Sequence, residues 1–145
     1  MAITSAICTS FKVEHLKGVH DFTATTGDTF KIALYTSSAT LGAGTTAFTT
    51  SNEITNSSGT AYTSGGATLT SVTPTSDSTT AVCDFADVSF TSASFTANGA
   101  LIYNSSESNA AVAAIAFGAD KTVSSGTFTI QFPTAGATTA IIRLA

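Results

Sequence analysis

The polar share of this sequence consists of hydroxyl side chains rather than charges, and this bias constrains the fold more than any other feature. Of 145 residues, 29 are Thr and 19 are Ser, whereas only 10% are charged. Threonine is β-branched and suits a pleated strand, serine suits turns, and exposed helical faces usually carry Glu, Lys and Arg. The composition therefore favours sheets over helices, and a surface with few charges favours close contact with other proteins.

The length and the apolar content predict one globular domain over residues 1–145. A chain of this size buries most of the surface that it exposes when unfolded. Hydrophobic residues make up 43% of it, too many for a disordered chain, yet no apolar stretch is long enough to cross a bilayer. The first ten residues lack the cationic and apolar regions of a secretory signal. We therefore expect synthesis in a reducing cytoplasm and no membrane partner.

The charged residues argue against a nucleic-acid partner. The net charge is −4, and the five basic residues are scattered along the chain. A protein that follows a phosphate backbone normally carries several clustered cations. We therefore expect binding to neither DNA nor RNA, and the acidic balance also disfavours an anionic membrane surface.

One short helix is predicted, near the N-terminus. Ser10 can cap a segment from Phe11 to Lys17, and Gly18 is placed to end it. The next predicted element is a strand over residues 29–36, where apolar residues alternate along the sequence TFKIALYT. The remaining predicted strands span residues 67–72, 79–85, 88–95, 100–103, 110–117, 127–132 and 140–144.

Turn signals delimit these strands, among them Pro74 with Asp77, Asn98-Gly99, and Gly118. The Ala-rich segment 110–116 would also fit a helix, but its apolar residues and the following glycine fit a buried strand better. Spacing of this kind predicts a mainly β domain, an antiparallel β-sandwich or a barrel, with one short N-terminal helix.

A long polar stretch is the candidate docking element, together with the N-terminal arm. Residues 37–66 are rich in Gly, Ser, Thr and Asn and carry only scattered apolar side chains. A compact domain rarely contains so long a structureless loop, so the stretch wraps the surface, contains a short strand, or is ordered by a neighbouring subunit. The candidate partner contacts are its apolar residues Leu41, Phe48, Ile54 and Tyr62.

The residues that could carry catalysis form no recognised pattern. His15 and His20 have no second ligand at metal spacing. Asp84 and Asp87 bracket the end of a strand, as turn residues do, and there is no Gly-x-Ser-x-Gly turn. We therefore predict no enzyme activity, no cofactor and no metal. A pocket on which His20, Asp21 and another titratable group converge would revive an enzyme.

The two cysteines are predicted to be buried free thiols. Cys8 and Cys83 lie far apart in the sequence, and nothing near them resembles a disulfide framework or a metal spacing. Free cysteine is among the most buried residue types.

Several segments together resemble a widespread family of small tailed-phage proteins, whose members are generally uncharacterised or described as virion structural proteins. The segments, in order over nearly the whole chain, are FKVEHLKGVHDF (11–22), DTFKIALYTS (28–37), AYTSGGATL (61–69), NGALIYN (98–104), FGADK (117–121), TFTIQFP (127–133) and AIIRL (140–144). None of them is a catalytic motif. The family tends to have Arg where this chain has Asn98 and Asp where it has Ala116, and we hypothesise that these two positions form an ion pair in relatives.

The resemblance implies a phage virion structural protein. Within that class we expect a capsid decoration, or cement, protein that binds the major capsid protein or other virion proteins in many copies, or as a homo-oligomer, and stabilises the head. The alternative in the same class is a tail or head-to-tail connector component. The alternative of another class is a carbohydrate- or receptor-binding module, for which Tyr35, Tyr62 and Tyr103 would be exposed platforms.

Overall fold

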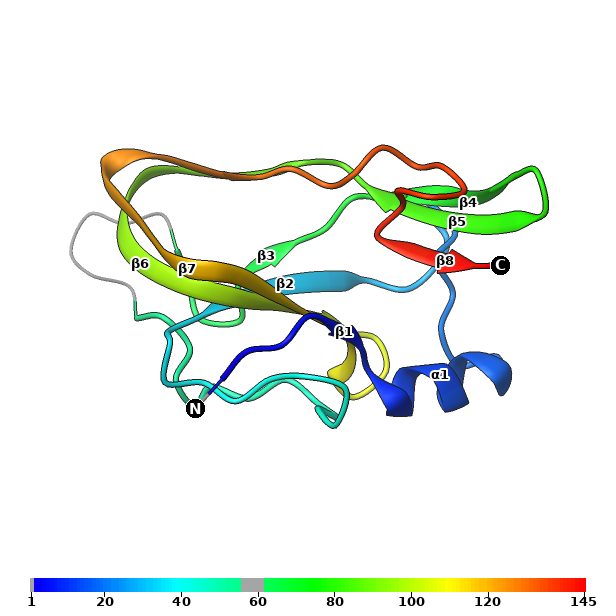
Figure 1. Ribbon diagram of the computed structural model, residues 1–145, viewed down its shortest axis with the longest axis horizontal. Coiled ribbons are helices and arrows are strands. Elements are labelled where there is room, and N and C mark those ends of the chain that lie inside the picture. Colours follow the sequence, from blue (N-terminus) through cyan, green and yellow to red (C-terminus); the bar gives the residue numbers. More distant parts are fainter. Residues whose placement is uncertain (1, 56–61) are drawn as a thin grey trace.

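The computed structural model describes residues 2–55 and 62–145, which form two antiparallel β-sheets and one helix (Figure 1). The elements are β1 (Ala6–Ile7), α1 (Thr9–Leu16), β2 (Phe30–Tyr35), β3 (Ala67–Thr68), β4 (Ser71–Asp77), β5 (Thr80–Phe85), β6 (Val88–Asn104), β7 (Ala110–Ile130) and β8 (Ile142–Leu144). The larger sheet has the order β1-β7-β6-β2-β3 and the smaller sheet the order β4-β5-β8. The predicted mainly β fold with one helix is confirmed. Of the two predicted architectures, the sandwich is compatible with the two sheets, whereas the sheets are not closed into a barrel.

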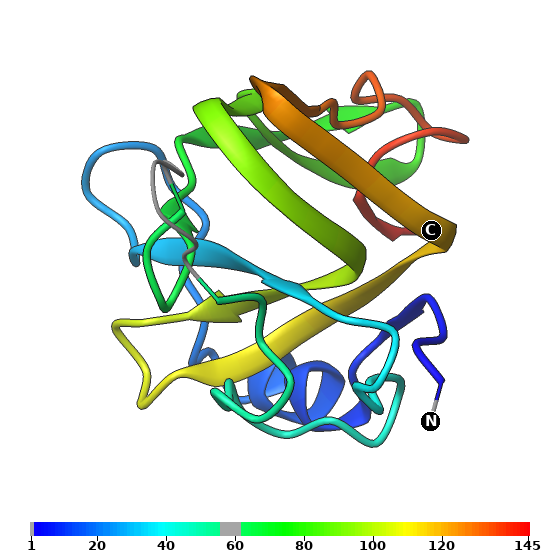
Figure 2. The ribbon, with the colours of Figure 1, turned by 90° about the vertical axis from the view of Figure 1, so that its left-hand side faces the viewer.

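The hairpin of β6 and β7 runs through both layers of the molecule (Figure 1; Figure 2). One half of it pairs with β2, and the other half bends over to the layer that contains β4 and β5. The pairing register shifts several times along the hairpin, and Ser92, Gly118 and Ser125 adopt φ values of 51°, 80° and 48° near these shifts. Such bulges bend and twist a strand pair, which explains how two long strands turn a corner.

Two glycines that indicate turns in the sequence lie inside these strands, so the strand ends predicted at Asn98-Gly99 and at Gly118 are wrong. At Gly99 in β6, a Cβ atom would lie 2.6 Å from the backbone oxygen of Ile115 on β7. This glycine therefore permits close approach of two strands instead of making a turn. Gly118 belongs to a bulge, and β7 continues to Ile130.

The proline that was expected to end a strand lies within β4. Pro74 sits where the register between β4 and β5 shifts, between Val72 and Thr75. β4 is an edge strand, and a proline at an edge or a bulge removes no ladder hydrogen bond. The predicted strand over residues 67–72 is therefore two strands, β3 and β4, and the second extends beyond the proline.

The start of the helix was also predicted two residues too late. α1 begins at Thr9, and its N-cap, Cys8, makes no side-chain capping hydrogen bond, so the prediction that Ser10 caps the helix is wrong. The Cys8 N–H donates to the carbonyl of Val112 at 2.9 Å, next to the pairing of β1 with β7. Strand pairing therefore sets where the helix begins. Its end is as predicted, with Gly18 at a φ of 75°.

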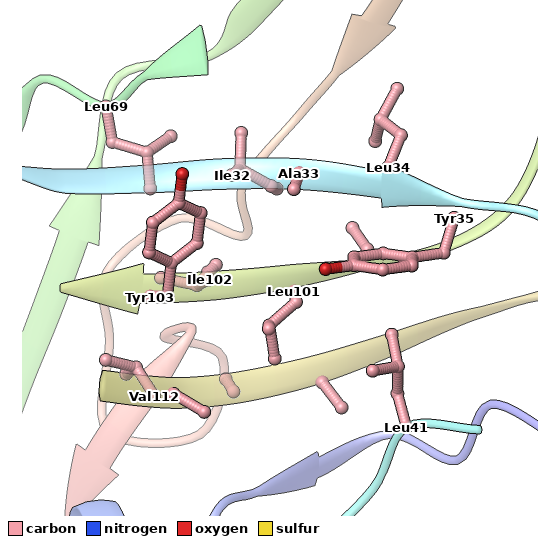
Figure 3. Close-up of a cluster of buried hydrophobic side chains, with 14 of the residues drawn as sticks. Ile32, Ala33, Leu34, Tyr35, Leu41, Leu69, Leu101, Ile102, Tyr103 and Val112 are labelled. Atoms are coloured by element: carbon pink, nitrogen blue, oxygen red, sulfur yellow. The ribbon is translucent and has the colours of Figure 1, made fainter. Parts of the chain in front are cut away.

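The core takes side chains from both sheets and from the polar stretch. Figure 3 shows its part on the larger sheet, where side chains of β2, β6 and β7 lie near Leu41 and Leu69. The largest fully buried aliphatic side chains of β2, β6 and β7 are Ile32, Leu34, Leu101, Ile102 and Val112. Towards the smaller sheet the core is aromatic: Phe22 stacks on Phe30 with ring centroids 4.3 Å apart, and Phe30 contacts Phe85 at 5.8 Å. Both cysteines are free, and Cys8 is buried whereas Cys83 is half-buried. No helix in residues 2–55 or 62–145 combines the length and apolar character needed to cross a membrane.

Candidate functional site

The side chains predicted to contact a partner lie in the core of their own chain. Leu41 and Ile54 are 4% exposed and Tyr62 is fully buried. Phe48 is half-buried and stacks on Tyr103, with ring centroids 4.6 Å apart. The polar stretch thus uses its apolar residues to hold itself against the larger sheet, which leaves these side chains little exposed surface. Their contact with a partner stays a prediction. Residues 56–61 of the stretch lie outside the described residues.

The three tyrosines are buried as well, which removes the platforms expected of a carbohydrate-binding module. Tyr35 and Tyr62 are 0% exposed and Tyr103 is 2% exposed. The hydroxyl of Tyr35 donates to the Thr49 carbonyl at 2.6 Å, and that of Tyr103 donates to the Gly65 carbonyl at 2.7 Å. A ring must present a free face to stack on a sugar, so these tyrosines serve packing.

A buried carboxylate organises this region, and the sequence reasoning missed it. Glu53 accepts hydrogen bonds from the Tyr62 hydroxyl at 2.6 Å, the Ser64 hydroxyl at 2.8 Å and the Gly65 N–H at 2.6 Å. The Tyr62 hydroxyl in turn accepts the Leu34 N–H at 2.9 Å. Burial, followed by the hydrogen bond to the carboxylate, raises the pKa of Tyr62 above its ordinary range. We call these residues the Glu53 network; it ties residues 62–65 to β2.

His20 is held in a second buried network. Its Nε2 lies 2.8 Å from Glu14 Oε2, and its Nδ1 lies 3.0 Å from the Asn104 Nδ2. The same amide nitrogen donates to Asp28 Oδ2 at 2.8 Å. The neutral ring with its proton on Nε2 satisfies this arrangement, a tautomer assigned from the hydrogen-bonding pattern. Both ring nitrogens therefore have partners, and the histidine fastens the segment after α1 to the end of β6.

A cleft of about 560 Å³ between α1 and the strands β5 and β8 is lined in part by His20 and Asp21, and we call it the α1–β8 cleft. The carboxylate of Asp21 accepts the Thr23 N–H at 2.9 Å, and hydrogen bonds from Thr23 lower the pKa of Asp21. Other titratable groups, Lys12, His15, Cys83 and Arg143, also line this cleft. Among the described residues, neither His20 nor Asp21 forms a hydrogen bond with any of them. Within the same part of the chain, no group of His, Cys, Asp and Glu could hold a metal ion.

A second groove, of about 590 Å³, follows the outer part of β7, and we call it the β7 groove. Its apolar lining consists of Ile115, Phe117, Phe128, Ile130, Phe132 and Ile141, all of them half-buried. Phe128 packs against Phe95 with ring centroids 5.0 Å apart, and Phe132 packs against Phe85 at 5.6 Å. These rings are thus fixed on one side by the core. Lys121 is the charged member of the described lining.

β7 has an open backbone edge along this groove. Its outer neighbour, β1, pairs only with Ala113 and Ala114, and the next contact is the Ala116 N–H, which donates to the Ser5 hydroxyl at 2.9 Å. From residue 117 to residue 130, no described strand pairs with the outer edge of β7. Unpaired N–H and C=O groups at such an edge can accept a strand of another chain.

The chain matches no known family model, no curated protein and no solved structure. The resemblance to tailed-phage virion proteins therefore stays a prediction. The two positions at which the chain departs from that family lie on neighbouring strands, since Gly99 is opposite Ala116. Asn98 donates to Asp120 Oδ1 at 2.8 Å in this chain. The ion pair hypothesised for relatives stays a prediction as well.

Proposed function

We propose that this chain is a structural assembly protein that binds other proteins through the β7 groove, and that it serves as a capsid decoration protein of a phage particle. The observation that carries the proposal is the groove itself. Its aromatic rings are anchored on the core, and hydroxyl and amide residues such as Thr129 and Gln131 surround them. Protein interfaces share this composition, with aromatic residues at the centre, a polar rim and few charges.

Covering the β7 groove costs little conformational entropy and removes apolar surface from water. Rings that are already fixed by the core lose little conformational freedom when a partner covers them, and fixed aromatic side chains are the usual binding hot spots. Full burial of an exposed ring contributes about 2 kcal/mol, so covering the exposed half of one of these rings contributes about 1 kcal/mol. Among the described residues, Lys121 is the charged side chain of the lining. A modest interface of this kind becomes strong when many copies bind one shell.

The open edge of β7 supports the same mode of binding. A partner strand that pairs with residues 117–130 would gain backbone hydrogen bonds and place alternate side chains in the groove. The edge also fits the alternative of a tail or connector component, in which copies of the chain would join edge to edge in a ring. The two roles differ in one measurable property: a connector forms closed rings by itself, whereas a decoration protein assembles on the shell.

The test uses phage particles from which this chain has been removed by deletion of its coding sequence. Purified chain should co-sediment with these particles, and sedimentation of the chain alone should show no closed ring. Thr129→Arg, at the groove, should weaken binding by at least about tenfold, because it places a charge beside the half-buried rings that a partner would cover. Thr75→Arg, on the exposed strand β4, is the matched control and should bind like the wild type. Equal binding of both variants, or absence of the chain from native particles, would refute the proposal.

A further inference from the structure

The α1–β8 cleft is lined by residues of α1 and of the strands β5 and β8. Figure 1 shows α1 on the same side of the molecule as β8. In β5 and β8, Ala81 is opposite Leu144 and Cys83 is opposite Ile142, so these four side chains share one face of the smaller sheet. Ile142 belongs to the core, which identifies this face as the inner one. The cleft, with a volume of about 560 Å³, is within the size range of small-molecule sites.

The lining of this cleft is suited to an apolar body. Phe11 and Phe22 line it, and Leu16 and Leu144 at its border are 88% and 54% exposed. Burial raises the pKa of Cys83 to about 11, so its thiol is neutral at pH 7 and adds to the apolar wall.

Most polar atoms in the lining are occupied by bonds within the chain, and Nδ1 of His15 is the buried exception among the described residues, with room for one hydrogen bond to a ligand. His20 uses both ring nitrogens, towards Glu14 and Asn104, and Asp21 accepts the Thr23 N–H. A sugar or another polar ligand would leave most of its own hydroxyl groups without partners here, which is costly. The chemistry of the lining therefore selects a hydrophobic molecule.

Charge distinguishes among hydrophobic molecules. The charged side chains of the lining are Lys12, Asp21 and Arg143, a local excess of one positive charge on a chain whose net charge is −4. Arg143 shares the outer face of the sheet with Val82, and its Nη1 donates to the Ala137 carbonyl at 2.7 Å. Arg143 keeps its charge and adds to the positive potential of the lining, and Lys12, on α1, is the cation placed to meet the head of a ligand.

We propose that the α1–β8 cleft binds an amphipathic organic anion, with an aliphatic or aromatic body in the cleft and an anionic head beside Lys12. This site is separate from the β7 groove and goes beyond the proposed role in assembly. Because its test uses the isolated chain, it can fail while the proposed function stands, and the reverse also holds.

The test compares three probes with straight alkyl chains of about ten carbons and differently charged head groups: decanoate, decan-1-ol and decyltrimethylammonium. Each is titrated into the full chain while its displacement of bound anilinonaphthalene sulfonate is followed by fluorescence. Decanoate should bind saturably and at least about fivefold more tightly than the other two probes, as expected for one partly screened ion pair. It should also slow the reaction of Cys83 with a thiol reagent, followed by mass spectrometry of the labelled peptide, which locates the probe in this cleft.

Two variants with matched controls complete the test. Lys12→Glu should abolish the preference for decanoate, whereas Lys17→Glu, on a lysine outside the lining, should preserve it. Ala81→Trp should fill the cleft and prevent binding, whereas Thr75→Trp on β4 should not. Equal affinity for the three probes, no saturable binding, or unchanged binding by Ala81→Trp would overturn the proposal. Protection of Cys83 in assembled particles but not by decanoate would indicate a protein occupant and would overturn it too.

Discussion

Replacing Glu53 by alanine tests whether the Glu53 network fixes the polar stretch to the sheet. The change removes the carboxylate that accepts from the Tyr62 hydroxyl, the Ser64 hydroxyl and the Gly65 N–H, and the first and last of these donors are buried. The Tyr62 hydroxyl still accepts the Leu34 N–H. Each buried donor without a partner costs about 1–3 kcal/mol, so we expect Glu53→Ala to lower the free energy of unfolding by about 3–5 kcal/mol. Since small domains unfold at about 5–15 kcal/mol, this is a large fraction of the total.

Glu53→Gln is the matched control, because its amide oxygen can still accept from Tyr62 and Gly65. Its amide nitrogen can donate to the Ser64 hydroxyl, which then acts as acceptor. We expect it to cost only about 1 kcal/mol, the part due to charge. Urea unfolding followed by circular dichroism gives both values from the midpoint and the slope. If the two variants are equally destabilised, the charge and not the acceptor geometry holds the stretch, and the reasoning is refuted.

Two further predictions concern a glycine and the tyrosines. Gly66→Ala should lower the free energy of unfolding by more than about 3 kcal/mol, because a Cβ atom there overlaps the Ile32 carbonyl. Gly118→Ala, at a similar positive φ but in open space, should lower it by about 1 kcal/mol in the same urea assay. Similar losses for the two variants would contradict this reasoning. Burial raises the pKa of Tyr103 from 10.0 to about 12, because the folded state favours the neutral hydroxyl. The contribution of Tyr103 to the free energy of unfolding should therefore be complete below pH 10 and lost as the pH rises through 12. Melting temperature and tyrosinate absorbance against pH check this, and a melting temperature constant from pH 9 to 12 would contradict it.

The strand β2 could be predicted from the sequence because its signals are local. Alternating apolar residues between polar ends give residues 29–36, and the strand spans Phe30–Tyr35. The end of α1 at Gly18 is local in the same sense. Such elements depend on side chains that are neighbours along the chain, so a sequence is enough to find them.

The long hairpin could not be predicted, because a glycine has the same local signal in a turn and in a bulge. Gly99 and Gly118 interrupt the apolar pattern, yet both lie within strands that continue on either side of them. The cross-strand partners, and not the sequence neighbours, decide this. The same holds for the candidate contacts. Whether Leu41 or Tyr62 faces solvent depends on a sheet assembled from distant segments. The β7 groove was missed for this reason too, since Phe117, Phe128 and Ile141 meet only after the hairpin bends.

The hydroxyl composition links the fold to the proposed function. Across the hairpin, hydroxyls pair with each other where charged residues often pair, as Ser89 does with Thr129 at 2.9 Å and Thr96 with Thr122 at 2.8 Å. From residue 122 to residue 130, β7 carries no charged side chain. Charges are a common means by which sheet edges resist pairing with other chains, and here bulges are left as the main protection. If the protein is present in many copies, as proposed, an apolar groove beside a weakly protected edge is costly to leave exposed. A partner that covers both would give this composition a physical reason.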